Sequence, residues 1–161
     1  MVRPRPGQRG LAHPADNAKN GRAFTIPIPA TVAAWFEDLR SLAGGSPWVL
    51  PARGRGRRTA HEHISASTLN AALKRIEGAR REPSPHDLRS TARSYLAELG
   101  VPVIVAERCL NHALGGLVDV YDKHDYMDER RRALELWAAF IETAERGEAW
   151  NVTPIRATAG A

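Results

Sequence analysis

Two basic residues stand one turn apart where a helix should begin, in the segment SPHDLRSTA, residues 84–92. Residues three apart on a helix share a face, so His86 and Arg89 are predicted to project together. The N-terminus of a helix also carries partial positive charge and unpaired N–H groups. The spacing therefore indicates a site for a phosphate group. The alternative is structural: His86 is an ordinary first-turn residue, and Arg89 pairs with Asp87 or Glu82.

The helix that must hold these side chains has clear start and stop signals. Ser84 is a good N-cap, Pro85 suits the first helical position, and Asp87 occupies the acidic position of a capping box. An apolar stripe follows and ends at Gly100, a residue type that favours the left-handed conformation at helix C-termini. The stripe consists of Leu88, Ala92, Tyr95, Leu96 and Leu99.

The rest of the pattern is mainly helical, with one candidate hairpin. The pair Asn20-Gly21 and the alternating run 24–28 predict a β-hairpin whose second strand is confined to a sheet edge by its prolines. Further helices are predicted over 30–43, 67–78, 102–110, 117–126 and 128–147, with Leu69, Leu73 and Ile76 facing inward in the second of these.

At 161 residues and 43% hydrophobic content, the chain is long enough and apolar enough to bury one core. We expect a mainly α fold with a small β-hairpin. We divide it into a flexible lead-in over 1–18, one domain over 19–147 and a frayed tail over 148–161. The single cysteine, Cys109, excludes an internal disulfide, fits a reducing cytosol and is expected in the core.

The net charge of +5 and a pI near 10.0 are unevenly distributed. Residues 1–93 contain 16 Lys and Arg against 7 Asp and Glu, whereas residues 94–161 contain 7 against 11. This asymmetry makes nucleic acid the leading partner class, the alternative being a merely basic protein. No apolar run approaches a membrane span, and the N-terminal segment has no signal-peptide pattern. We therefore expect a cytoplasmic protein with no membrane partner.

The ordered motifs resemble the catalytic domain of the tyrosine recombinases, the phage integrase family. They comprise Lys19, the run His86-Asp87-Leu88-Arg89, the run Leu110-Asn111-His112 and Tyr121, followed by the C-terminal run YDKHDYMDERRRALELWAAFI. The resemblance covers roughly residues 17–145 and implies a DNA breaking and rejoining enzyme of prokaryotic mobile elements. It implies double-stranded DNA as partner, a tetramer on DNA, and no metal or cofactor.

The resemblance also implies a role for each motif. Tyr121 would attack a DNA phosphodiester to give a 3′-phosphotyrosyl bond, with Tyr126 as the rival nucleophile. Lys19, with Arg22 as its rival, would protonate the leaving 5′-oxygen. Fixed cationic donors stabilise the charge that develops on the phosphate oxygens. These donors would be Arg89, His86 and His112, all converging with Tyr121 on one basic surface. The histidines of HEH, residues 61–63, are expected to be loop residues.

One element of the family pattern has no match here. The family has a further catalytic arginine in an early helix, but only 18 residues precede Lys19, and Arg3, Arg5 and Arg9 lie in a Pro/Gly-rich segment. We therefore expect an N-terminally truncated integrase with weak or no recombination alone, since losing one donor to the transition state costs about 10²–10³ in rate.

Six basic side chains are predicted to contact phosphates without reading sequence. They are Arg22, Arg53, Arg55, Lys74, Arg75 and Arg93. Two competing readings are a helix-turn-helix regulator built on residues 93–112 and a nuclease using His86 and His112 as acid and base. The apolar stripe of the C-terminal helix predicts that Trp137 is buried, in its own domain or against a partner.

Overall fold

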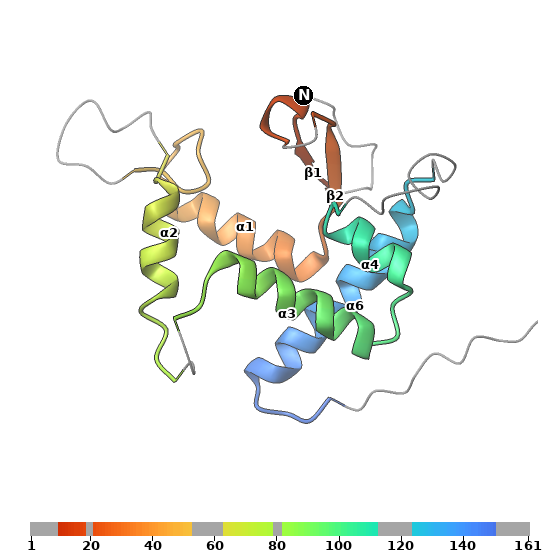
Figure 1. Ribbon diagram of the computed structural model, residues 1–161. Helices are drawn as coiled ribbons and strands as arrows, with labels where there is room; N and C mark the ends of the chain where they lie inside the picture. The colour runs from red at the N-terminus through yellow and green to blue at the C-terminus, as the bar shows by residue number, and fades with distance from the viewer. Residues whose placement is uncertain (1–9, 19–20, 53–62, 79–81, 113–123, 151–161) are drawn as a thin grey trace, which may run out of the picture. The chain divides into compact units, whose positions relative to one another are not determined.

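The computed structural model describes residues 10–18, 21–52, 63–78, 82–112 and 124–150 (Figure 1). The chain forms two compact units. Unit 1 combines residues 1–30 with residues 92–161, and unit 2 consists of residues 31–91. The described residues are mostly helical, with one two-stranded antiparallel sheet, as the sequence predicts.

The sheet belongs to unit 1 and corrects the expected flexible lead-in over residues 1–18. Strand β1, Gly10–His13, pairs with β2, Phe24–Pro27, with Gly10 opposite Pro27 and His13 opposite Phe24. A 3₁₀ turn, Ala15–Asn17, follows β1. Pro27 ends its strand at an edge, where its missing N–H interrupts no ladder. The strand β1 was not predicted because its residues form a strand only through pairing with β2.

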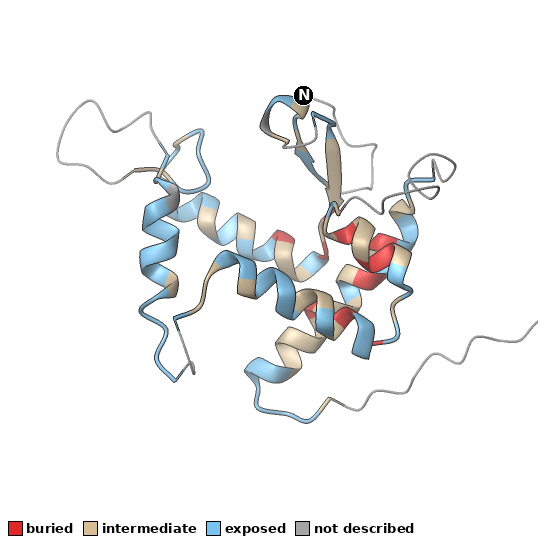
Figure 2. Ribbon diagram, in the orientation of Figure 1, coloured by how far each residue is buried: buried red, intermediate tan, exposed pale blue. Residues whose placement is uncertain are grey.

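The core of unit 1 is built from three helices: the last part of α3 (Pro85–Glu98), α4 (Val103–Cys109) and α6 (Met127–Glu145). Figure 2 shows the buried residues gathered where α4 runs beside α6. The central cluster comprises Leu96, Val105, Ala106, Cys109 and Ala133. Cys109 is thus a core residue, as its sequence context predicts.

The start and stop of α3 follow the predicted signals. The Asp87 carboxylate accepts hydrogen bonds from the backbone N–H of Ser84 (2.9 Å) and from its hydroxyl (2.6 Å). The Asp87 N–H in turn donates to Ser84 Oγ at 3.3 Å, which completes the capping box. At the other end, Gly100 has φ 77°, and the Val101 N–H donates to the Leu96 carbonyl at 3.0 Å. Because only glycine adopts this φ without strain, α3 ends there.

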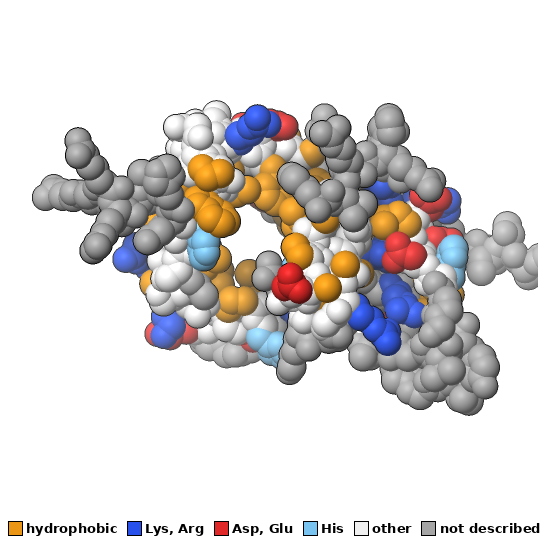
Figure 3. Space-filling model, turned by 90° about the horizontal axis from the view of Figure 1, so that it is seen from above, with side chains coloured by type: hydrophobic (Ala, Val, Ile, Leu, Met, Phe, Trp, Pro, Cys, Tyr) orange, Lys and Arg blue, Asp and Glu red, His pale blue; other side chains and the backbone are white. Residues whose placement is uncertain are grey.

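Unit 2 contains α1 (Ala30–Leu42), α2 (Ala66–Leu73) and the start of α3. Its hydrophobic side chains are more exposed than predicted. Leu69 and Ile76, expected to face inward, are 47% and 53% exposed, and Ile76 lies beyond the end of α2. Leu42 is 70% exposed. The space-filling view in Figure 3 likewise shows hydrophobic side chains reaching the surface.

The C-terminal helix α6 agrees closely with the predicted 128–147. Trp137 is half-buried in unit 1, where it stacks on Tyr95 (5.7 Å between ring centroids) and on Phe140 (5.4 Å). Trp150, which falls in the expected tail, contacts Phe140 edge-on at 5.7 Å, and residues 151–161 lie outside the described residues. Residues 124–126 of the predicted helix 117–126 are not helical, and the others lie outside the described residues.

Candidate functional site

The first turn of α3 presents both residues of the predicted phosphate site. His86 and Arg89 are exposed, and they belong to the part of α3 that lies in unit 2. Asp87 caps the helix through Ser84, and Glu82 pairs with Lys74 at 2.9 Å. Arg89 also has an interaction of its own within the protein, so the phosphate site at this helix N-terminus stays a prediction.

His112 lies in unit 1, immediately after α4, and is held by Glu107. Its Nδ1 lies 2.5 Å from Glu107 Oε2, and its backbone N–H donates to the Glu107 carbonyl oxygen at 3.0 Å. Asn111 makes this turn possible because it adopts φ 51°, a left-handed conformation that asparagine tolerates better than most residues. Local chain geometry thus orients the imidazole of His112.

Glu107 also binds a second cation. The Nε of Arg93, on α3, donates to Glu107 Oε1 at 2.6 Å, so each carboxylate oxygen has its own partner. The hydrogen bond from Arg93 is the largest effect on the pKa of Glu107 and lowers it; burial acts in the opposite direction, and His112 lowers the pKa further. Glu107 is therefore ionised at neutral pH, and no motif in the sequence indicated it.

The candidate nucleophile Tyr121 and general acid Lys19 lie outside the described residues, so their positions remain predictions. The rival nucleophile Tyr126 is described. It is half-buried, packs against the core cluster of unit 1 and contacts His124 edge-on at 4.6 Å. A side chain engaged in the core is a poor nucleophile for a DNA backbone, and this favours Tyr121.

Arg130 is a second residue that sequence reasoning missed. It is fully buried on α6, where its guanidinium donates to the Thr25 carbonyl oxygen of β2 and to Asp125 Oδ1 at 2.7 Å. The ring of Phe24 lies 4.4 Å from the guanidinium carbon. Burial lowers the pKa of Arg130, the nearby Asp125 opposing this shift. Arg130 thus joins the start of α6 to the hairpin strand that follows Lys19 and Arg22 in the sequence.

The predicted phosphate-contacting residues have different surroundings. Arg22 and Arg75 are exposed. Lys74 forms its exposed ion pair with Glu82, which raises the pKa of Lys74. Arg93 is only 27% exposed and is engaged with Glu107, while Arg53 and Arg55 lie outside the described residues. A DNA role for this set remains a prediction.

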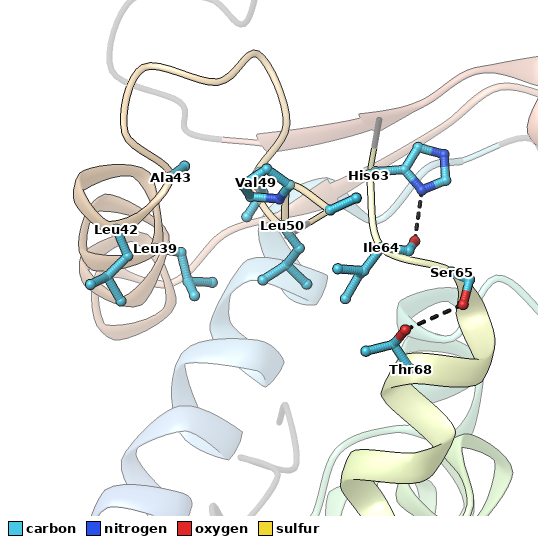
Figure 4. A pocket seen from close by; sticks show the side chains of 11 residues that line it. Leu39, Leu42, Ala43, Val49, Leu50, His63, Ile64, Ser65 and Thr68 are labelled. Atoms are coloured by element: carbon cyan, nitrogen blue, oxygen red, sulfur yellow. Dashed lines mark hydrogen bonds between the residues drawn. The ribbon is translucent and has the colours of Figure 1, made fainter. Parts of the chain in front are cut away.

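A pocket of about 630 Å³ lies in unit 2 (Figure 4). Leu39, Leu50 and Ile64 are among its apolar lining residues, and neither His86 nor Arg89 lines it. His63, from the HEH segment, lies at the pocket and bonds through Nδ1 to the Ile64 carbonyl oxygen at 2.8 Å. Of the described candidate residues, none is among those that line this pocket.

The packing of α4 bears on the helix-turn-helix reading. Val105, Ala106 and Cys109 are buried in the core of unit 1, and the helix has only seven residues. A recognition helix needs an exposed polar face along the DNA groove. The buried face of α4 therefore leaves little surface for DNA, and this disfavours an independent regulator.

The sequence matches the family model described as Phage integrase family over residues 9–128. The chain belongs to this family, whose members act in DNA integration and recombination, and its fold is a tyrosine recombinase catalytic domain. The match begins just before β1, which agrees with the structured hairpin at residues 10–27.

A curated relative supports the same family. The chain is 33% identical over 135 residues to "Prophage integrase IntA" of Escherichia coli (strain K12), and the aligned region covers 83% of this chain and 32% of that protein. The chain thus spans about a third of the length of this relative. No solved structure matches the chain. Among the described residues, no helix has both the length and the hydropathy needed to cross a membrane.

Proposed function

We propose that this chain carries the strand-cleaving centre of a site-specific tyrosine recombinase that acts on double-stranded DNA. The observation that carries the proposal is the exposed pair His86 and Arg89 at the capped start of α3, inside the region that matches the family. His112, held in a fixed orientation by Glu107, supplies a third donor. These groups suit the charge of a phosphate under attack.

In the proposed reaction the hydroxyl oxygen of Tyr121 attacks the phosphorus of a phosphodiester and gives up its proton to His86, which assists at the nucleophile as well as at the phosphate. The bond from phosphorus to the 5′-oxygen breaks, and Lys19 supplies the proton that this oxygen takes up. The product is a 3′-phosphotyrosyl link and a free 5′-hydroxyl, and attack by another 5′-hydroxyl reverses the step. Arg89, His86 and His112 donate to the non-bridging oxygens, where a planar guanidinium can hold two at once.

We further propose that cleavage by this chain alone is slow and that the active assembly is a tetramer on DNA. The family's additional arginine finds no match in this sequence, and one missing donor costs about 10²–10³ in rate. The activity of any longer protein that contains this domain is likewise a proposal, as is its DNA-associated location in a prokaryotic cytoplasm.

The test is capture on a suicide DNA substrate, in which a nick lets the cleaved 5′-end diffuse away. A slow enzyme accumulates the covalent adduct under these conditions. We expect an adduct with the wild-type chain and with Tyr126→Phe, the matched control, and none with Tyr121→Phe. Peptide mapping of the adduct identifies the linked residue. An adduct linked through Tyr126 contradicts the proposal. So does the absence of any adduct when the wild-type chain is tested on substrates taken from the DNA sequence of its host.

DNA binding is tested separately by its dependence on salt. Contacts to phosphates release counterions, so affinity for a random duplex should fall by orders of magnitude between about 50 and 200 mM salt. An affinity that is unchanged by salt, or a strict preference for one short sequence, would favour the regulator reading instead.

A further inference from the structure

The buried arginine of α6 joins two segments of unit 1 that are distant in sequence. The Nη2 of Arg130 donates to the carbonyl oxygen of Thr25, in β2. Its Nη1 donates to Asp125 Oδ1 at 2.7 Å and to the Asp125 carbonyl oxygen at 3.3 Å, just before α6 begins. The side chain is fully buried, and the centroid of the Phe24 ring lies 4.4 Å from the guanidinium carbon. One planar group thus holds β2 and the segment before α6 in fixed positions relative to each other.

Stability alone is a weak reason for an arginine at this position. Burial disfavours the charged guanidinium and lowers the pKa of Arg130, while Asp125 acts in the opposite direction. The Nε atom is buried without a hydrogen-bond partner among the described residues. A methionine or a leucine could fill most of the same space without desolvating a charge. Neither could donate to two segments in fixed directions, which the planar guanidinium does.

The two segments that Arg130 contacts each follow a proposed reacting group in the sequence. Thr25 comes six residues after Lys19, the candidate general acid, and Asp125 comes four residues after Tyr121, the candidate nucleophile. In an in-line displacement the attacking and leaving oxygens lie on opposite sides of the phosphorus. The group that attacks and the group that protonates the leaving oxygen must therefore be held a fixed distance apart.

We propose that Arg130 is a positioning residue for strand cleavage, which sets the strand that follows Lys19 against the residues that follow Tyr121. Because it is fully buried, it acts through the backbone that it anchors and not on the phosphate itself. The inference rests on the proposed function, since it assigns Arg130 to the same cleavage step. Loss of the guanidinium should leave both segments folded but let their separation vary. Cleavage would then slow at unchanged DNA affinity, because a misplacement of about 1 Å can cost about 100-fold in rate.

Two variants of the full chain weaken this contact to different extents. Arg130→Met keeps a buried stem of similar length but removes every donor. Asp125→Ala removes only the carboxylate contact, and because this side chain is 63% exposed the protein should fold normally. Arg132→Met, at an exposed position on the same helix, is the matched control. Each chain is tested on nicked suicide duplexes at saturating DNA, so that the rate of adduct formation is measured apart from binding.

A second substrate separates the positioning of the acid from a general loss of structure. In this duplex, sulfur replaces the scissile 5′-oxygen. Because a thiol is far more acidic than an alcohol, the thiolate leaves without a proton donor. Lys19→Met should therefore be slow on the oxygen substrate and recover on the sulfur substrate, which calibrates the assay.

We expect Arg130→Met to cleave the oxygen substrate about 100-fold more slowly than wild type and to recover about 10-fold of this loss on the sulfur substrate, where a misplaced acid no longer matters. Asp125→Ala should lose about 10-fold on both substrates, because it loosens the segment that follows Tyr121 but leaves Arg130 bonded to Thr25. Arg132→Met should cleave both substrates at the wild-type rate.

The inference is overturned if Arg130→Met cleaves the oxygen substrate as fast as wild type, if its loss is the same on both substrates, or if Arg132→Met loses as much. It is also overturned if Asp125→Ala is fully active, and this variant is decisive if Arg130→Met melts below the assay temperature. Failure of the proposed function is recognised separately. Wild type would then form no adduct on either substrate, or Lys19→Met would not recover with sulfur, and a positioning role in cleavage would fall with it.

Discussion

The buried guanidinium of Arg130 should be the main attachment between the hairpin and α6 in unit 1. It reaches Thr25 of β2 and Asp125, and it lies against Phe24. Arg130→Ala removes all of these contacts together with two of the three side-chain methylene groups, because the alanine methyl takes the place of Cβ. Arg130→Met keeps an apolar stem of similar length but removes the charge and the donors.

The expected losses follow from what each variant leaves behind. Burying the two lost methylene groups contributes about 1.6 kcal/mol, and leaving the Thr25 carbonyl without its donor costs about 1–3 kcal/mol. Asp125 is 63% exposed, so its ion pair adds little. Removing a buried charge also relieves its desolvation. We expect Arg130→Ala to lower the unfolding free energy by about 3–4 kcal/mol and Arg130→Met by about 1–2 kcal/mol.

Urea denaturation followed by circular dichroism measures these free energies. Arg132→Ala, an exposed position on the same helix, should change stability by less than about 0.5 kcal/mol and serves as the control. Hydrogen exchange should accelerate at the backbone amides of β1 and β2 in Arg130→Ala before it does so in α4. Equal stability of Arg130→Ala and wild type, or hairpin exchange unaffected by the change, would refute the reasoning.

Three further outcomes can be measured on the free protein. Burial raises the pKa of Cys109 to about 11, so its thiol is neutral at pH 8. We expect it to react slowly with a disulfide reagent in the native protein and rapidly in urea. Rapid labelling of the native protein would contradict this burial. Asn111→Val should lower the unfolding free energy by about 1–2 kcal/mol, because a β-branched residue is strained at φ 51°. Asn111→Gly should melt near the wild-type temperature, because glycine adopts this φ without strain. Equal losses in the two variants would exclude backbone strain as the cause. Trp137→Ala should lower the unfolding free energy by about 3 kcal/mol, because the ring stacks on Tyr95 within its own unit. The sedimentation coefficient of the protein should not change. A change in oligomer size would instead indicate that Trp137 docks on a partner.

Features encoded locally in the sequence were predictable. The capping box of Ser84 and Asp87 and the stop at Gly100 depend on residues within one or two turns, and the structure has both. The periodic stripe of α6 gave its length to within two residues at each end. These elements form because their own side chains and dihedral preferences favour them.

Features that depend on distant partners were not predictable. The strand β1 exists through its ladder with β2, and nothing in its own composition indicates a strand. Arg130 is one of three consecutive arginines, and residue type alone does not distinguish the buried one. A signal was nevertheless present, because Arg130 lies three, four and seven residues before Ala133, Leu134 and Trp137 on the inner stripe of α6.

The hold of Glu107 on His112 has a consequence for the thermodynamics of DNA binding. The imidazole of His112 is hydrogen-bonded to the Glu107 carboxylate, and its backbone is fixed by the N–H bond to the Glu107 carbonyl oxygen, so its side chain has already lost rotamer freedom in the free protein. An exposed side chain such as Arg75 loses about 0.5–1.5 kcal/mol of such freedom when a phosphate immobilises it. In the proposed complex, His112 therefore makes its hydrogen bond to the phosphate without this entropic penalty. Each exposed surface cation instead loses part of its binding free energy to the ordering of its own side chain.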